Sequence, residues 1–391
     1  MRPGAFFRLT ALLALAGTLL AAWSGTLGLG AHRTLASIAL PPLCALVAAS
    51  YVAHRRLLPG AGASLLLFLA AAAASGPRAV HVALAAGACA ATAWTAAAGL
   101  AGVPADGGPW RDYVTLVKPR IMSLLLLTGA CGMIAGAHGR PSPGRFLAAM
   151  AGLALACGGA SALNHLLDAD IDRLMGKRTE RRPVAAGRVP PARALEFGLA
   201  LSALSFVLLA TAVDLLTALL ALAGNLFYVV VYTRLLKRST PQNIVIGGAA
   251  GAVPPLVGWA AATGHVTLPA LYLFGIVFVW TPPHFWALAL LLREQYAAAK
   301  VPMLPVVSGE RETVRRILRY TLLLVAASVV PFATGAFGGL YLAAALVLGG
   351  GFLALAARLR RDASRRSAAL VFHYSLLYLA LLFVAVAASS Y

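Results

Sequence analysis

The sequence predicts an all-α fold, a polytopic bundle of transmembrane helices. Of the 391 residues, 61% are hydrophobic and only 11% are charged, whereas soluble domains carry about 25% charged residues. Apolar runs long enough to cross a bilayer recur along the whole chain. In lipid, such runs are stable only as segments that satisfy their own backbone hydrogen bonds, so each run is expected to form a helix.

Thirteen apolar runs are expected to span the membrane. The first resembles a signal peptide, but it continues to about residue 26, so we expect an uncleaved helix. The polar segment ADGGPWRD, at 105–112, separates two domains: an N-terminal transmembrane extension at 1–104, to which we assign no chemistry, and a second domain at 105–391. The expected spans are 5–26, 34–53, 61–76, 79–102, 119–138, 146–167, 193–213, 215–233, 243–263, 268–291, 315–337, 339–357 and 368–388.

The basic residues predict the orientation of the spans. The formal net charge is +20, and the positive residues cluster in short segments between apolar runs, at 173–193, 234–238, 293–319 and 358–366. The alternate connections near 214, 265 and 338 carry none. This distribution is typical of positive-inside topology in the inner (cytoplasmic) membrane and does not indicate nucleic-acid binding. The basic segments and the N-terminus are therefore expected in the cytoplasm, and Tyr391 outside.

The strongest chemical motif ends the sixth expected span. Asn164, Asp168 and Asp172 are spaced i, i+4, i+8, so on a helix they share one face. Oxygen ligands of this kind hold Mg²⁺, which takes one or two carboxylates and completes its shell with water and substrate phosphate. A basic run with Arg178 and Arg182 follows, and guanidinium groups bind phosphate oxygens. The combination is typical of a diphosphate site.

The alternative is a solvated helix end whose charges only fix the topology. Acidic residues usually lie at helix N-termini because of the helix dipole, and three Asp at this C-terminal end run against that preference. Asp170 points away from the Asn164 face and is expected to be a solvated neighbour. We expect Asp168→Ala to abolish turnover with little loss of fold, because a carboxylate at the rim of the bundle is not a packing residue.

Other motifs are open to more than one reading. Lys237 and Arg238, like Lys118 and Arg120, are either phosphate contacts or anchors that extend to the lipid headgroups. The stretch WTPPHFW, at 280–286, suits a flat apolar ligand. Its histidine, His284, is an acid or base, a haem ligand, or a core residue bonded to a freed backbone carbonyl.

Taken together, these stretches resemble a known family. NHLLDADIDRLMGKRTERRP (164–183) is similar to the N-x₃-D-x₃-D motif of the UbiA superfamily of intramembrane prenyltransferases. YTRLLKRSTPQNIVIGGAAGAVPPLVGWAAATG (232–264), WTPPHFWALAL (280–290) and VPMLPVV (301–307) resemble its protohaem IX farnesyltransferase (haem O synthase) branch. The resemblance covers roughly residues 112–388.

The resemblance implies a nine-helix prenyltransferase core, here preceded by about four extra helices. It implies transfer of a farnesyl group from farnesyl diphosphate to the 2-vinyl group of protohaem IX (haem b), which gives haem O and diphosphate for haem A and terminal oxidase biogenesis. It also suggests haem A synthase as a partner. Asn164, Asp168 and Asp172 would hold Mg²⁺, and His284 would act on the haem side. The substrate-binding residues would be Lys118, Arg120, Arg178, Arg182, Lys237, Arg238, Asn243, Trp280, Glu294 and Tyr296.

The chain departs from the family pattern at two places. The family usually has an Asp directly before the tyrosine at 296, where this chain has Gln295, with Glu294 one step earlier. Either Glu294 supplies that carboxylate, or a second metal site is weakened. The extension at 1–104 also lies outside the usual length. Two alternatives remain open: a prenyltransferase for an aromatic acceptor of quinone synthesis, and a haem-binding transporter or assembly factor.

Overall fold

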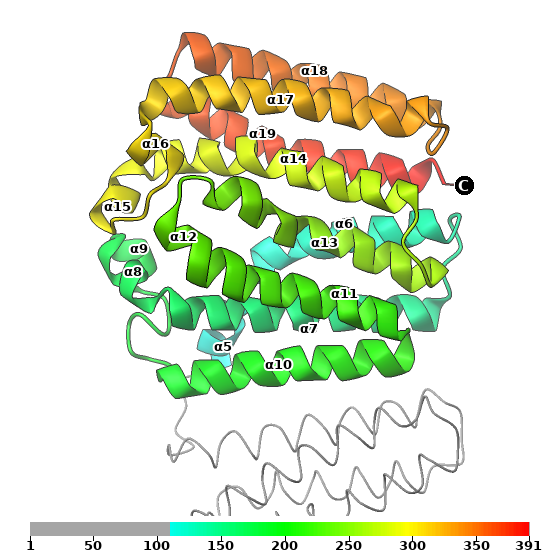
Figure 1. The fold of residues 1–391 in the computed structure, drawn as a ribbon, viewed down its shortest axis with the longest axis horizontal. Coiled ribbons are helices and arrows are strands. Elements are labelled where there is room, and N and C mark those ends of the chain that lie inside the picture. The colour runs from blue at the N-terminus through cyan, green and yellow to red at the C-terminus, as the bar shows by residue number, and fades with distance from the viewer. Residues whose placement is uncertain (1–109, 391) are drawn as a thin grey trace, which may run out of the picture.

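The computed structural model describes residues 110–390, and within them every regular element is a helix. Nine of these helices are long and apolar enough to cross a membrane, and they run side by side as a bundle (Figure 1). The four spans expected within 1–104 lie outside the described residues, so the two-domain division remains a prediction. The expected all-α polytopic fold is confirmed for the part of the chain that the structure describes.

The long helices match the nine expected spans in order and number. They are α6 (Pro119–Gly136), α7 (Pro143–Leu167), α10 (Pro191–Ala212), α11 (Leu215–Leu226) continued by the π-helix η2 (Phe227–Leu236), α13 (Asn243–Thr263), α14 (Leu268–Leu291), α17 (Gly309–Ala333), α18 (Gly339–Arg361) and α19 (Arg365–Ala388). Most differences lie at the ends. For example, α17 begins before the expected 315, because a polar first turn extends the helix beyond its apolar part.

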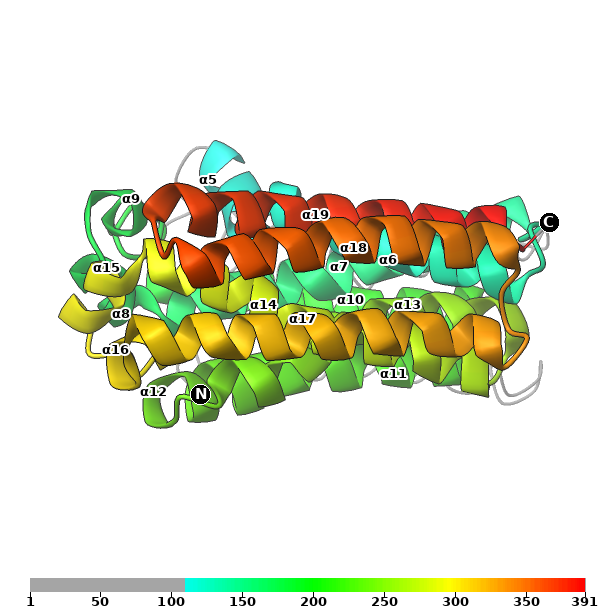
Figure 2. The same cartoon turned by 90° about the horizontal axis from the view of Figure 1, so that it is seen from above.

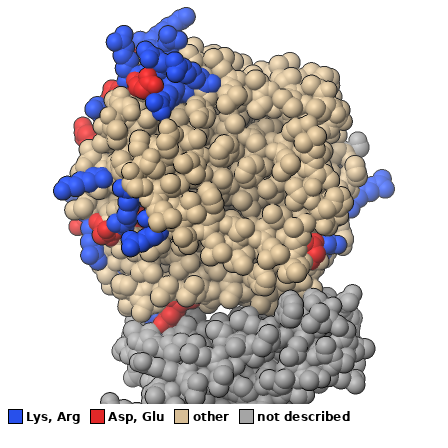
Figure 3. All heavy atoms as spheres, viewed as in Figure 1, with Lys and Arg blue, Asp and Glu red and all other residues tan. Residues whose placement is uncertain are grey.

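Six short helices lie at one end of the bundle. They are α5 (Trp110–Leu116), α8 (Ala169–Leu174), α9 (Lys177–Glu180), α12 (Lys237–Ser239), α15 (Arg293–Ala298) and α16 (Leu304–Val307). Seen from above, the long helices run along one direction, and the short helices gather at the same end (Figure 2). Most of the Lys and Arg side chains visible in Figure 3 lie over that end too. We call it the basic end.

Glycine contacts bring α6 and α13 together. A Cβ added at Gly258 would lie 1.9 Å from the carbonyl oxygen of Gly129, and one at Gly132 would lie 2.6 Å from the carbonyl oxygen of Pro255. Small residues allow the backbones of membrane helices to approach this closely. Gly258 of α13 and Gly132 of α6 therefore allow close helix packing, and α13 is one of the most buried spans.

Candidate active site

A buried polar cluster lies at the basic end, where α7 passes into α8. Asn164 is in the last turn of α7, Asp168 is its C-cap, and Asp172 lies in α8. The helix is interrupted at Asp168, yet the amide of Asp172 still donates to the carbonyl of Asp168 at 2.8 Å. The i, i+4, i+8 spacing therefore survives the interruption, and all three side chains are at most 3% exposed.

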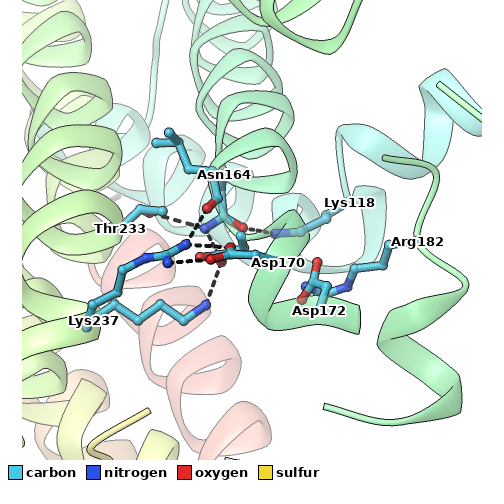
Figure 4. Close-up of polar contacts among 10 residues, drawn as sticks. Lys118, Asn164, Asp170, Asp172, Arg182, Thr233 and Lys237 are labelled. Atoms are coloured by element: carbon cyan, nitrogen blue, oxygen red, sulfur yellow. Dashed lines mark hydrogen bonds and ion pairs between the residues drawn. The ribbon is translucent and has the colours of Figure 1, made fainter. Parts of the chain in front are cut away.

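Asn164 joins three elements of the bundle (Figure 4). Its Oδ1 accepts a hydrogen bond from Nζ of Lys118 at 2.7 Å. Its Nδ2 donates to Oδ2 of Asp168 at 2.8 Å and to Oγ1 of Thr233 at 3.1 Å. Because Asn164 is held by α6, α8 and η2 contacts at once, its side chain has a single orientation. Thr233, which is fully buried in η2, carries no sequence signal that marks it as a site residue.

Each carboxylate of the cluster pairs with one cation and leaves one oxygen unpaired. Oδ2 of Asp168 accepts from Nζ of Lys237 at 2.5 Å, and Oδ1 of Asp172 accepts from Arg182 at 2.7 Å. Oδ1 of Asp168 and Oδ2 of Asp172 are buried and have no partner among the described residues. A buried acceptor without a partner is costly, so these two oxygens fit a hard cation. Nowhere in residues 110–390 do three or more His, Cys, Asp or Glu residues form a metal-binding group.

Lys118 reaches this cluster from a strained backbone. It precedes Pro119 at the start of α6 and has left-handed dihedrals, φ 50° and ψ 62°, which are costly for a residue with a side chain and concentrate at functional sites. Its ammonium group points at Asn164 and donates to Oδ1 of that residue. Burial, together with repulsion from Arg182 and Lys237, lowers the pKa of Lys118 to about 7.

The π-helix η2 brings Thr233 and Lys237 to α7. Its backbone closes i→i+5 turns, as in the hydrogen bond from the amide of Lys237 to the carbonyl of Tyr232. The wider turn changes the direction of every side chain that follows, and π-helical turns are frequent at functional sites. The hydropathy of 215–233 predicts an ordinary span, because hydropathy does not distinguish an α-helix from a π-helix.

Arg238 has a different position from Lys237. It donates two hydrogen bonds of 2.7 Å to the carboxylate of Asp170, and a third to the carbonyl of Leu167 at the end of α7. Hydrogen bonding to Arg238 lowers the pKa of Asp170 to about 2. Asp170 is exposed, as expected. Arg120 is exposed at the start of α6, and the side chain of Arg178 lies outside the described structure.

The short helix α15 brings Tyr296, and not Glu294, close to the charges of the Asn164 cluster. Tyr296 is 8% exposed, and burial raises the pKa of its hydroxyl to about 12; the charges of Arg182, Asp168 and Asp172 also act on it. Glu294 is exposed. Gln295 is half-buried beside Gly176, where an added Cβ would lie 4.0 Å from its Cγ.

Asn243, by contrast, forms a hydrogen bond within the turn between α12 and α13. Its Nδ2 donates to the carbonyl of Thr240 at 2.7 Å, and its Oδ1 is buried without a partner among the described residues. The side chain is fully buried. The structure therefore gives Asn243 a role in closing this turn, while its unpaired oxygen keeps it among the candidate substrate contacts.

His284 lies between two aromatic rings in a second polar group. Its imidazole stacks on Trp280 at 4.3 Å and on Phe372 of α19 at 4.9 Å. The hydroxyl of Ser375 donates to the carbonyl of Phe372 at 2.6 Å, so its oxygen accepts from Nδ1 of His284, also at 2.6 Å. This pairing places the ring hydrogen on Nδ1 and leaves a lone pair on Nε2. The side-chain partner of His284 is thus a serine hydroxyl, and a backbone hydrogen bond with Phe372 also acts on its ring.

Nearly all residues of the two polar groups fall within one recognisable domain. The model of the UbiA prenyltransferase family matches residues 125–385, which include His284 and every member of the Asn164 cluster except Lys118. The chain belongs to the UbiA prenyltransferase family. The nine described spans and the prenyltransferase class expected from the sequence agree with this membership.

Two relatives share about half of their residues with the family domain of this chain. A Protoheme IX farnesyltransferase from Marinobacter nauticus is 52% identical over 275 residues, which are 70% of this chain and 91% of the relative. A protein of the same name from Symbiobacterium thermophilum is 54% identical over 277 residues, 70% of this chain and 92% of the relative.

Solved structures of UbiA proteins share the fold. A digeranylgeranylglyceryl phosphate synthase is similar with a TM-score of 0.61 and 18% identity, over 72% of this chain and 98% of that protein. A UbiA homologue from Archaeoglobus fulgidus, bound to GPP and Mg²⁺, is similar with a TM-score of 0.52 and 18% identity, over 70% of this chain and 99% of the homologue.

Proposed function

We propose that this chain transfers the farnesyl group of farnesyl diphosphate to the 2-vinyl group of protohaem IX, giving haem O and diphosphate for haem A synthesis. The observation that carries the proposal is the buried Asn164 cluster, in which three cations and two half-paired carboxylates meet. The relatives named Protoheme IX farnesyltransferase support the choice of acceptor. A partnership with haem A synthase is part of the proposal.

The cations of the cluster stabilise the leaving group. When the allylic C–O bond of farnesyl diphosphate breaks, its electron pair goes to the diphosphate and a farnesyl cation remains. Arg182 and Lys237, together with Lys118 in its protonated form, supply positive charge where this negative charge develops, and such preorganised electrostatic stabilisation is usually the largest single term in catalysis. The terminal vinyl carbon of haem then attacks the farnesyl cation. A water molecule adds to the resulting porphyrin-side cation and releases a proton.

The oxygens of Asn164, Asp168 and Asp172 would hold Mg²⁺, with Oδ1 of Asp168 and Oδ2 of Asp172 as the unpaired ligands. When bound, the metal would supply Lewis-acid stabilisation of the leaving oxygens. Mg²⁺ dependence is proposed from this donor set and from the Mg²⁺-bound Archaeoglobus homologue. Because Glu294 is exposed and Gln295 has no charge, we assign no second carboxylate pair to α15.

The aromatic group around His284 is the proposed acceptor side. Trp280, His284 and Phe372 form a stack of flat rings on α14 and α19, and such a stack suits a porphyrin. The Ser375 contact leaves Nε2 of His284 able to accept a proton or bind iron. The basic end would face the cytoplasm, where the charged diphosphate arrives without crossing lipid.

The test uses membranes that contain this protein, incubated with protohaem, farnesyl diphosphate and Mg²⁺. Mass analysis of the extracted haems should show the hydroxyethylfarnesyl product, and a chelator should abolish it because the carboxylates then lack their cation. Prenylation of 4-hydroxybenzoate-like acceptors without any new haem would favour the quinone-pathway alternative. Haem binding without diphosphate release would favour a carrier.

A further inference from the structure

We propose that His165, the neighbour of Asn164 on α7, is an additional diphosphate-binding residue that donates a ring N–H to a diphosphate oxygen. The proposal rests on the proposed function, because it adds a residue to the same site. It comes from a feature that neither the metal ligands nor the cations explain: a buried imidazole whose polar atoms have no protein partner.

The side chain of His165 is 2% exposed, and both ring nitrogens are buried. Neither Nδ1 nor Nε2 has a hydrogen-bond partner among residues 110–390. A buried polar group without a partner costs free energy, and each such group calls for an explanation. A histidine that served only packing would be expected to bind a neighbour, as His284 binds Ser375 and His373 binds the carbonyl of Ala369.

The position of His165 points to an anion. On a helix, residue 165 follows Asn164 by about 100° of rotation, so its ring lies beside the face that carries the cluster. The charges that act on this ring are those of Lys118, Arg182 and Lys237. All three are cations and offer no acceptor for an imidazole N–H. They are also the residues that surround the half-paired carboxylates.

A diphosphate bound by these three cations would bring phosphate oxygens to the same place. One ring nitrogen of neutral His165 would then donate to a phosphate oxygen. The other would accept from an ammonium group or from a water molecule. The substrate thus satisfies a group that the protein leaves unpaired, and the desolvation of the ring favours substrate binding.

Two substitutions of similar volume separate binding from packing. His165→Leu removes both polar atoms, whereas His165→Gln keeps an N–H donor. With purified full-length protein, calorimetry should show that His165→Leu weakens binding of Mg²⁺-diphosphate by roughly ten- to a hundredfold. His165→Gln should recover part of this loss. The melting temperature of His165→Leu should equal or exceed that of the parent protein, because two unpaired polar atoms are gone.

The control is His265→Leu, the same change at an exposed histidine after α13, outside the cluster, and it should leave the dissociation constant unchanged. A His165→Leu protein that binds diphosphate within twofold of the parent overturns the inference. So does a melting temperature clearly below the parent's, since it would show structural partners for the ring. A parent protein that binds no diphosphate and makes no prenylated haem would instead sink the proposed function.

Discussion

At the scale of single residues, the structure changes what a test of Asp168 must look like. The sequence suggested a rim carboxylate that alanine could replace at little cost to the fold, and this premise is wrong. Asp168 is 1% exposed and pairs with the buried ammonium of Lys237. Removal of one partner of a buried ion pair leaves an uncompensated charge and is strongly destabilising. A loss of activity in Asp168→Ala would therefore not distinguish a lost catalytic role from a loss of folded protein.

Asp168→Asn is the cleaner substitution, because the amide keeps the shape and an oxygen for Lys237. We expect turnover to fall by about 10²–10³-fold, since the negative oxygen that would face the metal is lost. The rate of haem O formation in matched amounts of membrane measures this. Asp170→Asn, two residues along and exposed, is the matched control and should stay within a few-fold of the parent. Equal losses in both variants would refute the role of Asp168.

The residues that the sequence nominated do not all converge on one point. Lys118, Asn164, Asp168 and Lys237 form one hydrogen-bonded network, and the charges of the paired Asp172 and Arg182 act on Lys118. Arg238, in contrast, binds Asp170 and the end of α7, although it follows Lys237 directly in the sequence. Lys237 and Arg238 point about 100° apart on the helix, and here Lys237 reaches Asp168 whereas Arg238 reaches Asp170. On α15, likewise, Glu294 is exposed whereas Tyr296 is buried.

At the scale of elements, the fit of α6 against α13 depends on Gly258. We expect Gly258→Ala to lower the free energy of unfolding by about 1–3 kcal/mol or more, because the new methyl group would overlap the backbone oxygen of Gly129. Thermal melting in detergent measures the change. Gly251→Ala in the same helix has open space around the added methyl group, and should match or exceed the parent's stability. Equal stability of the two variants would contradict the close contact.

The π-helix η2 offers a second test at this scale. Deletion of the exposed Val230 would remove the extra residue of the wide turn and rotate Thr233 and Lys237 relative to Asn164. We expect at least a hundredfold loss of turnover, because small displacements of positioning groups have effects of about that size, while the protein still inserts into membranes. Val230→Ala keeps the register and should remain active. Normal activity of the deletion variant would show that the wide turn does not position the site.

At the scale of the whole molecule, the distribution of charge predicts the orientation. Within residues 110–390, few basic residues lie at the end opposite the candidate active site. One of them, Arg145, is paired with Asp214 at 2.7 Å, which joins the start of α7 to the start of α11. This pair reduces the positive charge at that end. The remaining excess of Lys and Arg at the basic end predicts that this end, with the Asn164 cluster, lies on the cytoplasmic side.

Cysteine labelling from one side of the membrane tests this orientation. In a background where Cys44, Cys89, Cys131 and Cys157 are replaced by Ala, Ser142→Cys lies at the far end and Ser239→Cys at the basic end, both at exposed positions. An impermeant maleimide added to intact cells or spheroplasts should label Ser142→Cys and not Ser239→Cys. Inverted vesicles should give the opposite pattern. The reverse result in both preparations would mean that the active site opens to the outside.

The sequence by itself determined the helical class, the nine described spans and the common face of Asn164, Asp168 and Asp172. Hydropathy and charge are local properties, and the three residues of the Asn164 motif lie within one short stretch, so their common face can be read from spacing alone. Tertiary structure decided which distant groups complete that face. Thr233, Lys237, Ser375 and Phe372 reach their partners only through a π-helical turn and the packing of α14 against α19. These contacts join residues far apart in the chain, so they cannot be predicted from a local sequence pattern.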